Sequence, residues 1–249
     1  MAWLLDLDGV VWLAGVAIPG SVEAVADLRA AGERVVFVTN NSSARVADQE
    51  KKLADIGIPA PGDVLTSAMA AAHLLEPGST GLVCGGPGIT EALEARGVTT
   101  VRDGAADAVV VGFHLDFDYQ RLRAAAAAVR DGARLIGTND DATYPTPEGE
   151  IPGGGAILAA VAYAASATPT VAGKPNEPMA AAVRDLVGTG PHVMVGDRPS
   201  TDGRFARRLG APFALVLSGV TRADELPVEP APDVVGADLA EVVTRRVID

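Results

Sequence analysis

The sequence predicts an α/β protein in which a doubly wound core of parallel strands carries a second, inserted α/β domain. Short β-branched runs alternate with alanine-rich amphipathic segments, which is typical of βαβ units. Breaker clusters at 76–79 and 167–169 bracket the insertion. The 249 residues, 48% of them hydrophobic, are enough to bury one large core and a smaller one. We therefore expect a core formed by 1–78 and 169–249, and an inserted domain over 79–168.

The core elements are expected in the following order. The apolar run at 3–5 predicts the first strand, which leads directly into Asp6-Leu7-Asp8. Ser21 precedes a helix that continues to about Ala31, and Gly32 suits its C-terminal end. The remaining core elements are a charged helix around 50–52, a helix ending near Leu75, and apolar strands at 35–38, 64–65, 171–172 and 193–195.

The inserted domain is expected to contain its own alternation of strands and helices. The strands are predicted at 81–84, 108–113 and 134–137, and two helices at 89–96 and 118–131. A third helix is predicted after the glycines at 153–155 and continues to about Ala165. Two glycine-rich stretches, at 85–88 and 153–155, lack the Lys-Ser/Thr ending of a P-loop and the spacing of a dinucleotide fingerprint. Both are therefore expected to be turns before helices.

Charge and cysteine content narrow the kinds of partner. With 32 acidic against 20 basic residues, the formal charge is −12, which repels nucleic acid and anionic membranes. Cys84 stands alone, so no intrachain disulfide can form, and a reducing, cytoplasmic compartment is the simplest assumption. We also find no export signal before the first strand and no apolar stretch long enough to cross a bilayer. We expect a cytoplasmic protein that binds neither nucleic acid nor membrane.

Polar clusters follow four of the apolar strands assigned to the core. They are Asp6-Leu7-Asp8, Thr39-Asn40-Asn41-Ser42, Gly173-Lys174-Pro175 and Gly196-Asp197-Arg198. Because the carboxyl ends of parallel strands meet at one edge of a sheet, we expect the four clusters to converge there. Asp6 and Asp8 alone could hold a divalent cation, attack an electrophile, or cap a strand end before a turn.

Together the clusters have complementary chemistry. They and the residues just after them supply four carboxylates: Asp6, Asp8, Asp197 and Asp202. These charges would repel one another unless a hard cation such as Mg²⁺ occupied the site. Lys174 adds a positive charge, and the Thr39 hydroxyl with the backbone donors of 39–42 suits phosphate oxygens. The combination predicts phosphoryl transfer with Mg²⁺ as cofactor.

At this point the chain resembles the haloacid dehalogenase superfamily of phosphatases, whose four motifs it carries in order. The motifs are Asp6-Leu7-Asp8-Gly9-Val10, Thr39, Lys174 and the run from Gly196 to Asp202. The Asn-Asn-Ser sequence after Thr39, the Gly-Lys-Pro sequence around Lys174 and the large insertion between them resemble the NagD-like subfamily, or class IIA. The resemblance implies a Rossmann-like core, an α/β cap of the C2 type over 79–168, and a small phosphorylated metabolite as substrate.

The resemblance also implies a role for each core residue. Asp6 would attack phosphorus and form an aspartyl-phosphate, and Asp8 would serve as the acid and the base. Mg²⁺ would be held by the Asp6 carboxylate, the Asp8 main-chain carbonyl and Asp197. Asp202 would orient the waters on the metal, and Lys174 would neutralise the nucleophile and the phosphate. The implied phosphate-binding residues are Thr39, Asn40, Asn41 and Lys174.

The inserted domain is expected to close over the site and to select substrates. Candidates for substrate contact in it are His114, Asn139 and Asp141. The run Thr138-Asn139-Asp140-Asp141 resembles the family's cap motif, whereas Gly112-Phe113-His114 stands where related sequences often carry Gly-Leu-Asp. A surface histidine and polar turn residues are the plainer alternatives for these positions.

Hydrolysis of a phosphate monoester is the expected reaction. Asp8 argues against a dehalogenase, because a leaving halide needs no proton donor, and a transport ATPase would need membrane spans. A phosphotransferase on the same fold, or a noncatalytic module that binds phosphate or Mg²⁺, stays an alternative. The resemblance also implies a homodimer.

Overall fold

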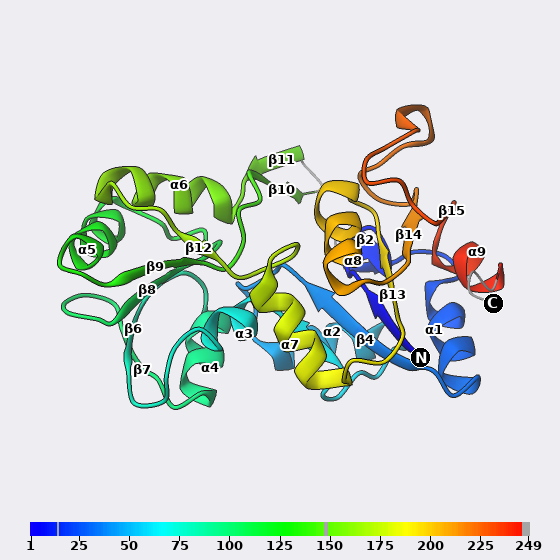
Figure 1. Cartoon of the computed structure of the whole chain (residues 1–249), viewed down its shortest axis with the longest axis horizontal. Coiled ribbons are helices and arrows are strands. Elements are labelled where there is room, and N and C mark those ends of the chain that lie inside the picture. Colours follow the sequence, from blue (N-terminus) through cyan, green and yellow to red (C-terminus); the bar gives the residue numbers. More distant parts are fainter. Residues whose placement is uncertain (14, 147–148, 246–249) are drawn as a thin grey trace. The chain divides into compact units, whose positions relative to one another are not determined.

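The computed structural model describes residues 1–13, 15–146 and 149–245 (Figure 1). It divides into two compact units, each with a parallel sheet and helices of its own. The first unit consists of Met1–Thr39, Ala47–Leu65 and Lys174–Asp249, and the second of Asn40–Val46 and Thr66–Gly173. The predicted α/β fold class is confirmed.

The first unit is built on a six-stranded sheet with the order β15-β14-β13-β1-β4-β5. Its strands are β1 (Ala2–Leu5), β4 (Arg34–Thr39), β5 (Val64–Thr66), β13 (His192–Gly196), β14 (Phe213–Val216) and β15 (Val234–Gly236). All four residues of β1 are buried, and both neighbours run parallel to it: Leu5 pairs with Phe37 of β4 and with Val195 of β13. The carboxyl ends of β1, β4 and β13 therefore meet at one edge of this sheet.

Helices and a short hairpin complete the first unit. The helices are α1 (Ser21–Ala30), α2 (Val46–Asp55), α7 (Glu177–Val187), α8 (Arg204–Leu209) and α9 (Leu239–Thr244), with a π-helical turn at Pro199–Gly203 and a 3₁₀ turn at Ala223–Glu225. β2 (Trp12–Leu13) pairs antiparallel with β3 (Val16–Ala17). α1 packs against α9 and β4, and α7 packs against α8. None of the helices that the structure describes is long and apolar enough to cross a membrane.

The second unit is built on a five-stranded sheet with the order β12-β9-β8-β6-β7, in which all the pairings are parallel. Its strands are β6 (Thr80–Cys84), β7 (Thr99–Val101), β8 (Ala108–Val111), β9 (Arg134–Gly137) and β12 (Thr170–Val171). Its helices are α3 (Ser67–Ala72), α4 (Pro87–Ala95), α5 (Tyr119–Arg130) and α6 (Gly154–Ala165). A hairpin of β10 (Thr143–Thr146) and β11 (Gly149–Pro152) precedes α6.

Helices cover both faces of the second sheet. Val109 and Val111 of β8 belong to one hydrophobic cluster with residues of α5 and α6 such as Ala125 and Leu158. On the opposite face, a Cβ at Gly81 of β6 would lie 3.1 Å from the Leu93 side chain of α4. A strand covered on both faces reads as a continuous apolar run, which is why the valines of β8 are easy to recognise in the sequence.

One prediction about the core sheet is wrong. The sequence predicts Val171-Ala172 as a strand of the core, but β12 pairs with β9, with Thr170 beside Ile136, and so belongs to the second unit's sheet. The first unit resumes only at Lys174. A two-residue apolar strand carries no information about which sheet it joins, because its neighbours are set by the rest of the fold.

The division into units also differs from the predicted boundaries near 78 and 169. α3 packs against α4, and Arg134 Nη2 donates to the Leu74 carbonyl at 2.8 Å, which joins the segment after β5 to the second unit. The short loop Asn40–Val46 is grouped there as well. The breaker cluster at 76–79 thus marks a turn inside the second unit, and the assignment of 79–168 as a cap stays a prediction.

Candidate active site

The candidate site lies at the carboxyl edge of the first unit's sheet. Asp6 directly follows β1, and its backbone N–H donates to the Val195 carbonyl of β13 at 3.0 Å. Asp197 follows β13, and Asp202 lies in the π-helical turn that comes next. One carboxylate oxygen from each of these three aspartates lies within 4.8 Å of the others. Three acids from two distant parts of the chain therefore face one point.

A buried lysine contacts two of these carboxylates. Lys174 is 2% exposed, and its Nζ lies 2.9 Å from Asp6 Oδ1 and 2.7 Å from Asp202 Oδ1. Burial by itself would lower the pKa of the ammonium, but the charges of Asp202 and Asp6 outweigh burial and hold the pKa above its usual range. Lys174 is therefore a permanent positive charge beside Asp6.

Asp8 lies two residues beyond Asp6 and is held by an indole. Trp12 Nε1 donates to Asp8 Oδ1 at 3.1 Å, and the N–H groups of Val11 and Trp12 both donate to the Leu7 carbonyl, which closes the turn between the two side chains. Burial raises the pKa of Asp8 to about 6, and the negative charge of Asp6 adds to the rise. An acid whose pKa lies near neutrality can both give and take a proton.

A loop that the sequence analysis did not single out holds Asp197. After β14, the Val220 N–H donates to Asp197 Oδ2 at 2.7 Å, and the Thr221 hydroxyl donates to the Asp197 carbonyl at 2.6 Å. A Cβ at Gly219 would lie 2.1 Å from Asp197 Oδ2, so only glycine fits there. The sequence contains a pattern that could have identified this loop. The apolar run of β14 is followed by Ser-Gly-Val-Thr, as the other strands of the site are followed by polar clusters.

The two buried acids resist ionisation with only the protein's own charges around them. Burial, together with the charges of Asp6 and Asp202, raises the pKa of Asp197 to about 7. Burial also raises the pKa of Asp202 to about 6, although Lys174 and the Arg198 N–H, which donates to Asp202 Oδ2 at 3.1 Å, oppose the rise. More positive charge is needed to ionise this group of oxygens fully. Carboxylate oxygens are what Mg²⁺ and Ca²⁺ prefer, so the donor set fits a hard divalent cation.

The structure places the predicted residues in both units. Asp6, Asp8, Thr39, Lys174, Asp197 and Asp202 belong to the first unit, whereas Asn40, Asn41, His114, Asn139 and Asp141 belong to the second. Thr39 is buried at the end of β4. Asn41 Oδ1 accepts a hydrogen bond from the Ser43 N–H at 3.0 Å, as in an Asx turn.

Two of the expected substrate contacts hold the loop after Thr39. Asn139 Nδ2 donates to the Asn40 carbonyl at 2.8 Å, and Asn40 Nδ2 donates to Asp141 Oδ2 at 3.2 Å. Asn139 is 5% exposed, and its Oδ1 accepts from the Asp141 N–H at 3.3 Å. These bonds fix the backbone and the side chain of Asn40. Contact of Asn139 or Asp141 with a substrate stays a prediction.

His114 is buried in the second unit, so its plainer interpretation as a surface histidine is wrong. Its Nδ1 lies 2.9 Å from the Gly112 carbonyl, and its ring packs edge-on against Phe117 with centroids 5.6 Å apart. Burial lowers its pKa, which favours the neutral ring. Among the described residues no group hydrogen-bonds to its Nε2. Substrate contact by His114 stays a prediction.

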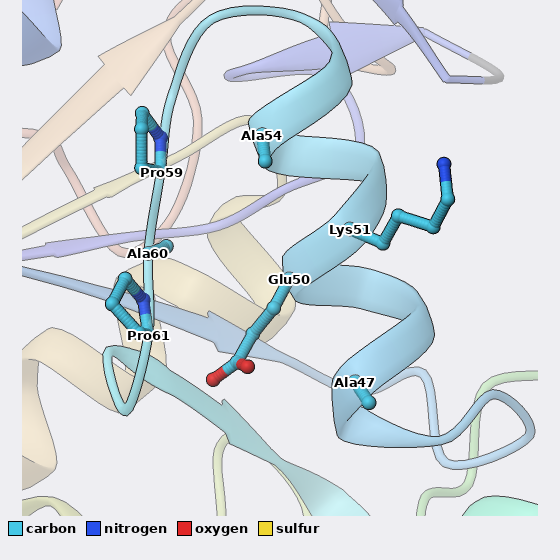
Figure 2. A pocket seen from close by; sticks show the side chains of 7 residues that line it. All are labelled: Ala47, Glu50, Lys51, Ala54, Pro59, Ala60 and Pro61. Carbon is cyan, nitrogen blue, oxygen red and sulfur yellow. The ribbon is translucent and has the colours of Figure 1, made fainter.

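A shallow pocket of about 300 Å³ lies elsewhere in the first unit, between α2 and the segment 59–61 (Figure 2). Figure 2 shows Glu50 pointing toward Pro61, while Lys51 points to the other side of the helix. Glu50 Oε1 accepts from the Gly62 N–H at 2.8 Å. None of the predicted site residues lines this pocket, and the carboxylate that does line it, Glu50, already accepts this hydrogen bond within the protein.

Fold and site together define a class of protein. A parallel α/β core that gathers aspartates and a buried lysine at its strand ends is the architecture of enzymes that transfer phosphoryl groups through an aspartate. The chain belongs to the haloacid dehalogenase-like hydrolases: the family model of that description matches residues 3–99, and a HAD-hydrolase-like model matches residues 171–242.

Relatives of known activity agree with this assignment. The chain is 37% identical over 249 residues to D-glycerol 3-phosphate phosphatase of Mycobacterium tuberculosis, covering 95% of this chain and 69% of that protein. It is 34% identical to acid sugar phosphatase of Staphylococcus saprophyticus, covering 97% and 96% of the two chains. A structure of glycerol phosphate phosphatase from M. tuberculosis in complex with magnesium superimposes with a TM-score of 0.90, at 35% identity over 97% of this chain and 75% of that chain. The resemblance to the superfamily is confirmed, and matches spanning both units agree with its NagD-like branch.

Proposed function

We propose that this protein is a Mg²⁺-dependent phosphatase that hydrolyses monoesters of small phosphorylated metabolites through an aspartyl-phosphate on Asp6. One observation carries the proposal. Asp6 lies 2.9 Å from the ammonium of Lys174 and within 4.8 Å of carboxylate oxygens of Asp197 and Asp202, so a nucleophile, a fixed cation and ligands for a divalent cation share one point. The relatives' phosphatase names support the same reaction.

In the first half of the reaction Asp6 attacks phosphorus, and the bond from phosphorus to the leaving oxygen breaks. Asp8 gives its proton to that oxygen, so the product leaves as a neutral alcohol. Lys174 offsets the negative charge of both the nucleophile and the entering phosphate. This half ends with phosphate on Asp6 and with Asp8 ionised.

In the second half Asp8 takes a proton from the water that attacks phosphorus. The bond between phosphorus and the Asp6 oxygen breaks, Asp6 regains its carboxylate, and inorganic phosphate leaves with Asp8 protonated again. A pKa raised to about 6 suits a group that must be an acid in one step and a base in the next.

The proposed Mg²⁺ ligands are the Asp6 carboxylate, the Asp8 carbonyl and Asp197, with Asp202 orienting the waters on the metal. When bound, Mg²⁺ supplies positive charge to the phosphoryl oxygens and helps to align them. Val220 and Thr221 hold the carboxylate and carbonyl of Asp197 in place. Mg²⁺ in the related glycerol phosphate phosphatase supports this part of the proposal.

The remaining assignments rest on the motifs. Thr39, Asn40, Asn41 and Lys174 bind the phosphoryl oxygens. The catalytic core is proposed for 1–78 and 169–249, although β12 and the segment after β5 pack with the second unit. The cap is proposed for 79–168, with His114, Asn139 and Asp141 as candidate substrate contacts. The named relatives point to phosphorylated polyols and sugars as the first substrates to test. The charge of −12 and the lone Cys84 support a cytoplasmic enzyme that acts on neither nucleic acid nor membrane lipid. A homodimer is proposed from the family resemblance.

A panel of phosphorylated metabolites, together with p-nitrophenyl phosphate, tests the proposal. Purified protein with Mg²⁺ should release inorganic phosphate, and EDTA or Asp6→Asn should abolish the release. Asp27→Asn, a change at an exposed acid of α1, serves as the matched control and should leave the rate unchanged. Phosphate that appears on an added alcohol would instead identify a phosphotransferase. An Mg²⁺-loaded protein that turns over no member of the panel would favour a noncatalytic module.

A further inference from the structure

The chain has two tryptophans, and their indole N–H groups differ in what they meet. Trp3 and Trp12 are both in the first unit and nearly equally buried, at 4% and 5% exposed. No group described by the structure accepts a hydrogen bond from Trp3 Nε1. Trp12 Nε1 donates to Asp8 Oδ1 at 3.1 Å. Because the two indoles are nearly equally buried and only that of Trp12 has a described acceptor, burial alone does not account for its hydrogen bond to Asp8.

The backbone fixes the Trp12 indole against Asp8. Gly9 has a φ of +84°, which lets the chain turn back at once, and its N–H donates to the Trp12 carbonyl at 2.8 Å. The Trp12 N–H donates to the Leu7 carbonyl at 3.1 Å, so Trp12 is anchored to both sides of the turn. Ser218 Oγ donates to the Gly9 carbonyl at 2.7 Å and braces the turn from β14's side. The position of the indole is set before any ligand binds.

An indole N–H can donate but cannot accept. Asp8 Oδ1 must therefore offer a lone pair to Trp12, and the proton that Asp8 carries in its acid form belongs on Oδ2. When Asp8 is ionised, Oδ2 is also the oxygen left free to take a proton from water. The same oxygen serves both half-reactions without rotation of the carboxyl group.

We propose that Trp12 is a positioning residue for acid and base catalysis, which holds Asp8 by Oδ1 and leaves Oδ2 to exchange the proton with the leaving oxygen and with water. The inference rests on the proposed phosphatase reaction. In the step that Trp12 assists, the bond from phosphorus to the leaving oxygen breaks, its electron pair stays on that oxygen, and the proton of Asp8 Oδ2 joins it. The water step returns one proton to the same Oδ2.

The test compares Trp12→Phe with Trp3→Phe on esters of different leaving-group acidity. The parameter is kcat/KM, which covers the reaction through formation of the aspartyl-phosphate. For an alkyl ester such as glycerol phosphate, whose leaving oxygen needs a proton, Trp12→Phe should lower kcat/KM about tenfold or more. For p-nitrophenyl phosphate, whose leaving group departs as a stable anion, the loss should be about twofold or less. Trp3→Phe should leave kcat/KM unchanged for both esters.

A second pair of measurements covers the case in which Trp12→Phe folds poorly. Benzothienylalanine has the size of tryptophan with sulfur in place of the N–H, and it can be placed at position 12 in the Trp3→Phe protein. It should reproduce the selective loss on alkyl esters. Independently of turnover, Asp8→Asn should move the indole N–H resonance of Trp12 in a proton–nitrogen spectrum and leave that of Trp3 in place.

The outcomes separate the two proposals. Failure of the wild-type protein to hydrolyse any ester would remove the phosphatase proposal itself. A wild-type protein that hydrolyses both esters, with a Trp12→Phe variant that loses equally on both or on neither, would overturn the role of Trp12. An unmoved Trp12 resonance in Asp8→Asn would also overturn it, because the hydrogen bond would then be absent in solution.

Discussion

Each unit gathers the carboxyl ends of parallel strands at one edge of its sheet, but the side chains at the two edges differ in charge. The first edge holds the carboxylates of Asp6, Asp197 and Asp202 around a buried lysine. In the second unit, β8 is followed by Gly112 and β9 by Thr138 and Asn139, and no charged group is among them. We call Gly112, Thr138 and Asn139 the neutral edge. A carboxylate follows them along the chain, and it is bound within the same unit: Asp141 Oδ2 accepts a hydrogen bond from Asn40 Nδ2 at 3.2 Å.

The polar side chains of the neutral edge make hydrogen bonds within the protein. Thr138 Oγ1 lies 2.8 Å from Ser42 Oγ, and Asn139 uses both ends of its amide, toward the Asn40 carbonyl and the Asp141 N–H. At the charged edge, by contrast, burial and mutual repulsion leave carboxyls with raised pKa values. Similar α/β architecture thus has two uses: one edge holds a loop in place, and the other gathers several carboxylates that repel one another and suit a cationic ligand.

Removing the buried cation from the charged edge should have the largest effect. In Lys174→Met the chain length is similar, but Asp6 and Asp202 lose the ammonium that lies within 2.9 Å of both. We expect the free energy of unfolding at pH 8 to fall by about 4 kcal/mol, and turnover to be lost. Urea unfolding at two pH values measures this. The loss should shrink at pH 5, where the acids can take protons, and an equal loss at both would argue against a charge effect.

Adding a charge to the neutral edge should be nearly as costly. Asn139→Asp keeps the shape but turns the donor that meets the Asn40 carbonyl into a carboxylate oxygen, in a site that is 5% exposed. We expect a destabilisation of about 3 kcal/mol at pH 8 from the buried unpaired charge. The matched change Asp140→Asn, at an exposed neighbour, should cost little. If thermal unfolding shows Asn139→Asp to be as stable as the wild type, the edge is less closely packed than its hydrogen bonds indicate.

The difference between the edges also shows what the sequence could reveal. The strands β1, β4, β8 and β13 were predictable because buried parallel strands are continuous apolar runs. The carboxylates after β1 and β13 were predictable because few structural uses need so many acids. The hydrogen bonds of Trp12 to Asp8 and of Val220 to Asp197 were not predictable, since they depend on where loops return in space.

The neutral edge was harder to interpret from sequence for a related reason. Asn139 and Asp141 are polar residues after a strand, and that pattern is the same whether the side chains face a substrate or hold a loop. Only the contact of Asn139 with Asn40, 99 residues away along the chain, distinguishes the two uses. β12 was assigned to the wrong sheet on similar grounds, because Thr170 and Val171 offer no pattern that names β9 as a partner.

The charged edge should make the metal-free protein less stable as pH rises. Asp8 and Asp202 have pKa values raised to about 6, and Asp197 to about 7, from 3.8. Between these values and 3.8 the folded state binds more protons than the unfolded state, so the free energy of unfolding falls with pH. The stabilisation is complete below about pH 3.8 and is lost as the pH rises through the folded pKa values of about 6 and about 7. In EDTA we expect a decrease on the order of 3 kcal/mol from pH 5 to pH 8.

Urea unfolding at several pH values, with EDTA and with saturating Mg²⁺, checks this pH dependence. Bound Mg²⁺ favours ionised carboxylates, so the decrease should disappear or reverse when the metal is present. If the free energy of unfolding in EDTA stays level or rises from pH 5 to pH 8, the pKa values of these carboxyls are not raised in the folded protein.

Asp197→Asn should give the smallest effect and the sharpest test of the comparison, because it makes one position of the charged edge resemble the neutral edge. The amide oxygen can still accept from the Val220 N–H, and the Thr221 hydroxyl still meets the main-chain carbonyl. Removing a charge that Asp6 and Asp202 repel should raise the free energy of unfolding in EDTA by about 1 to 2 kcal/mol at pH 8. At pH 5 the gain should vanish, because Asp197, with its pKa raised to about 7, is already protonated there.

Mg²⁺ should no longer raise the melting temperature of Asp197→Asn, whereas the control Asp27→Asn should respond to Mg²⁺ as the wild type does. A gain of equal size at both pH values would mean that packing, and not charge, separates the two edges.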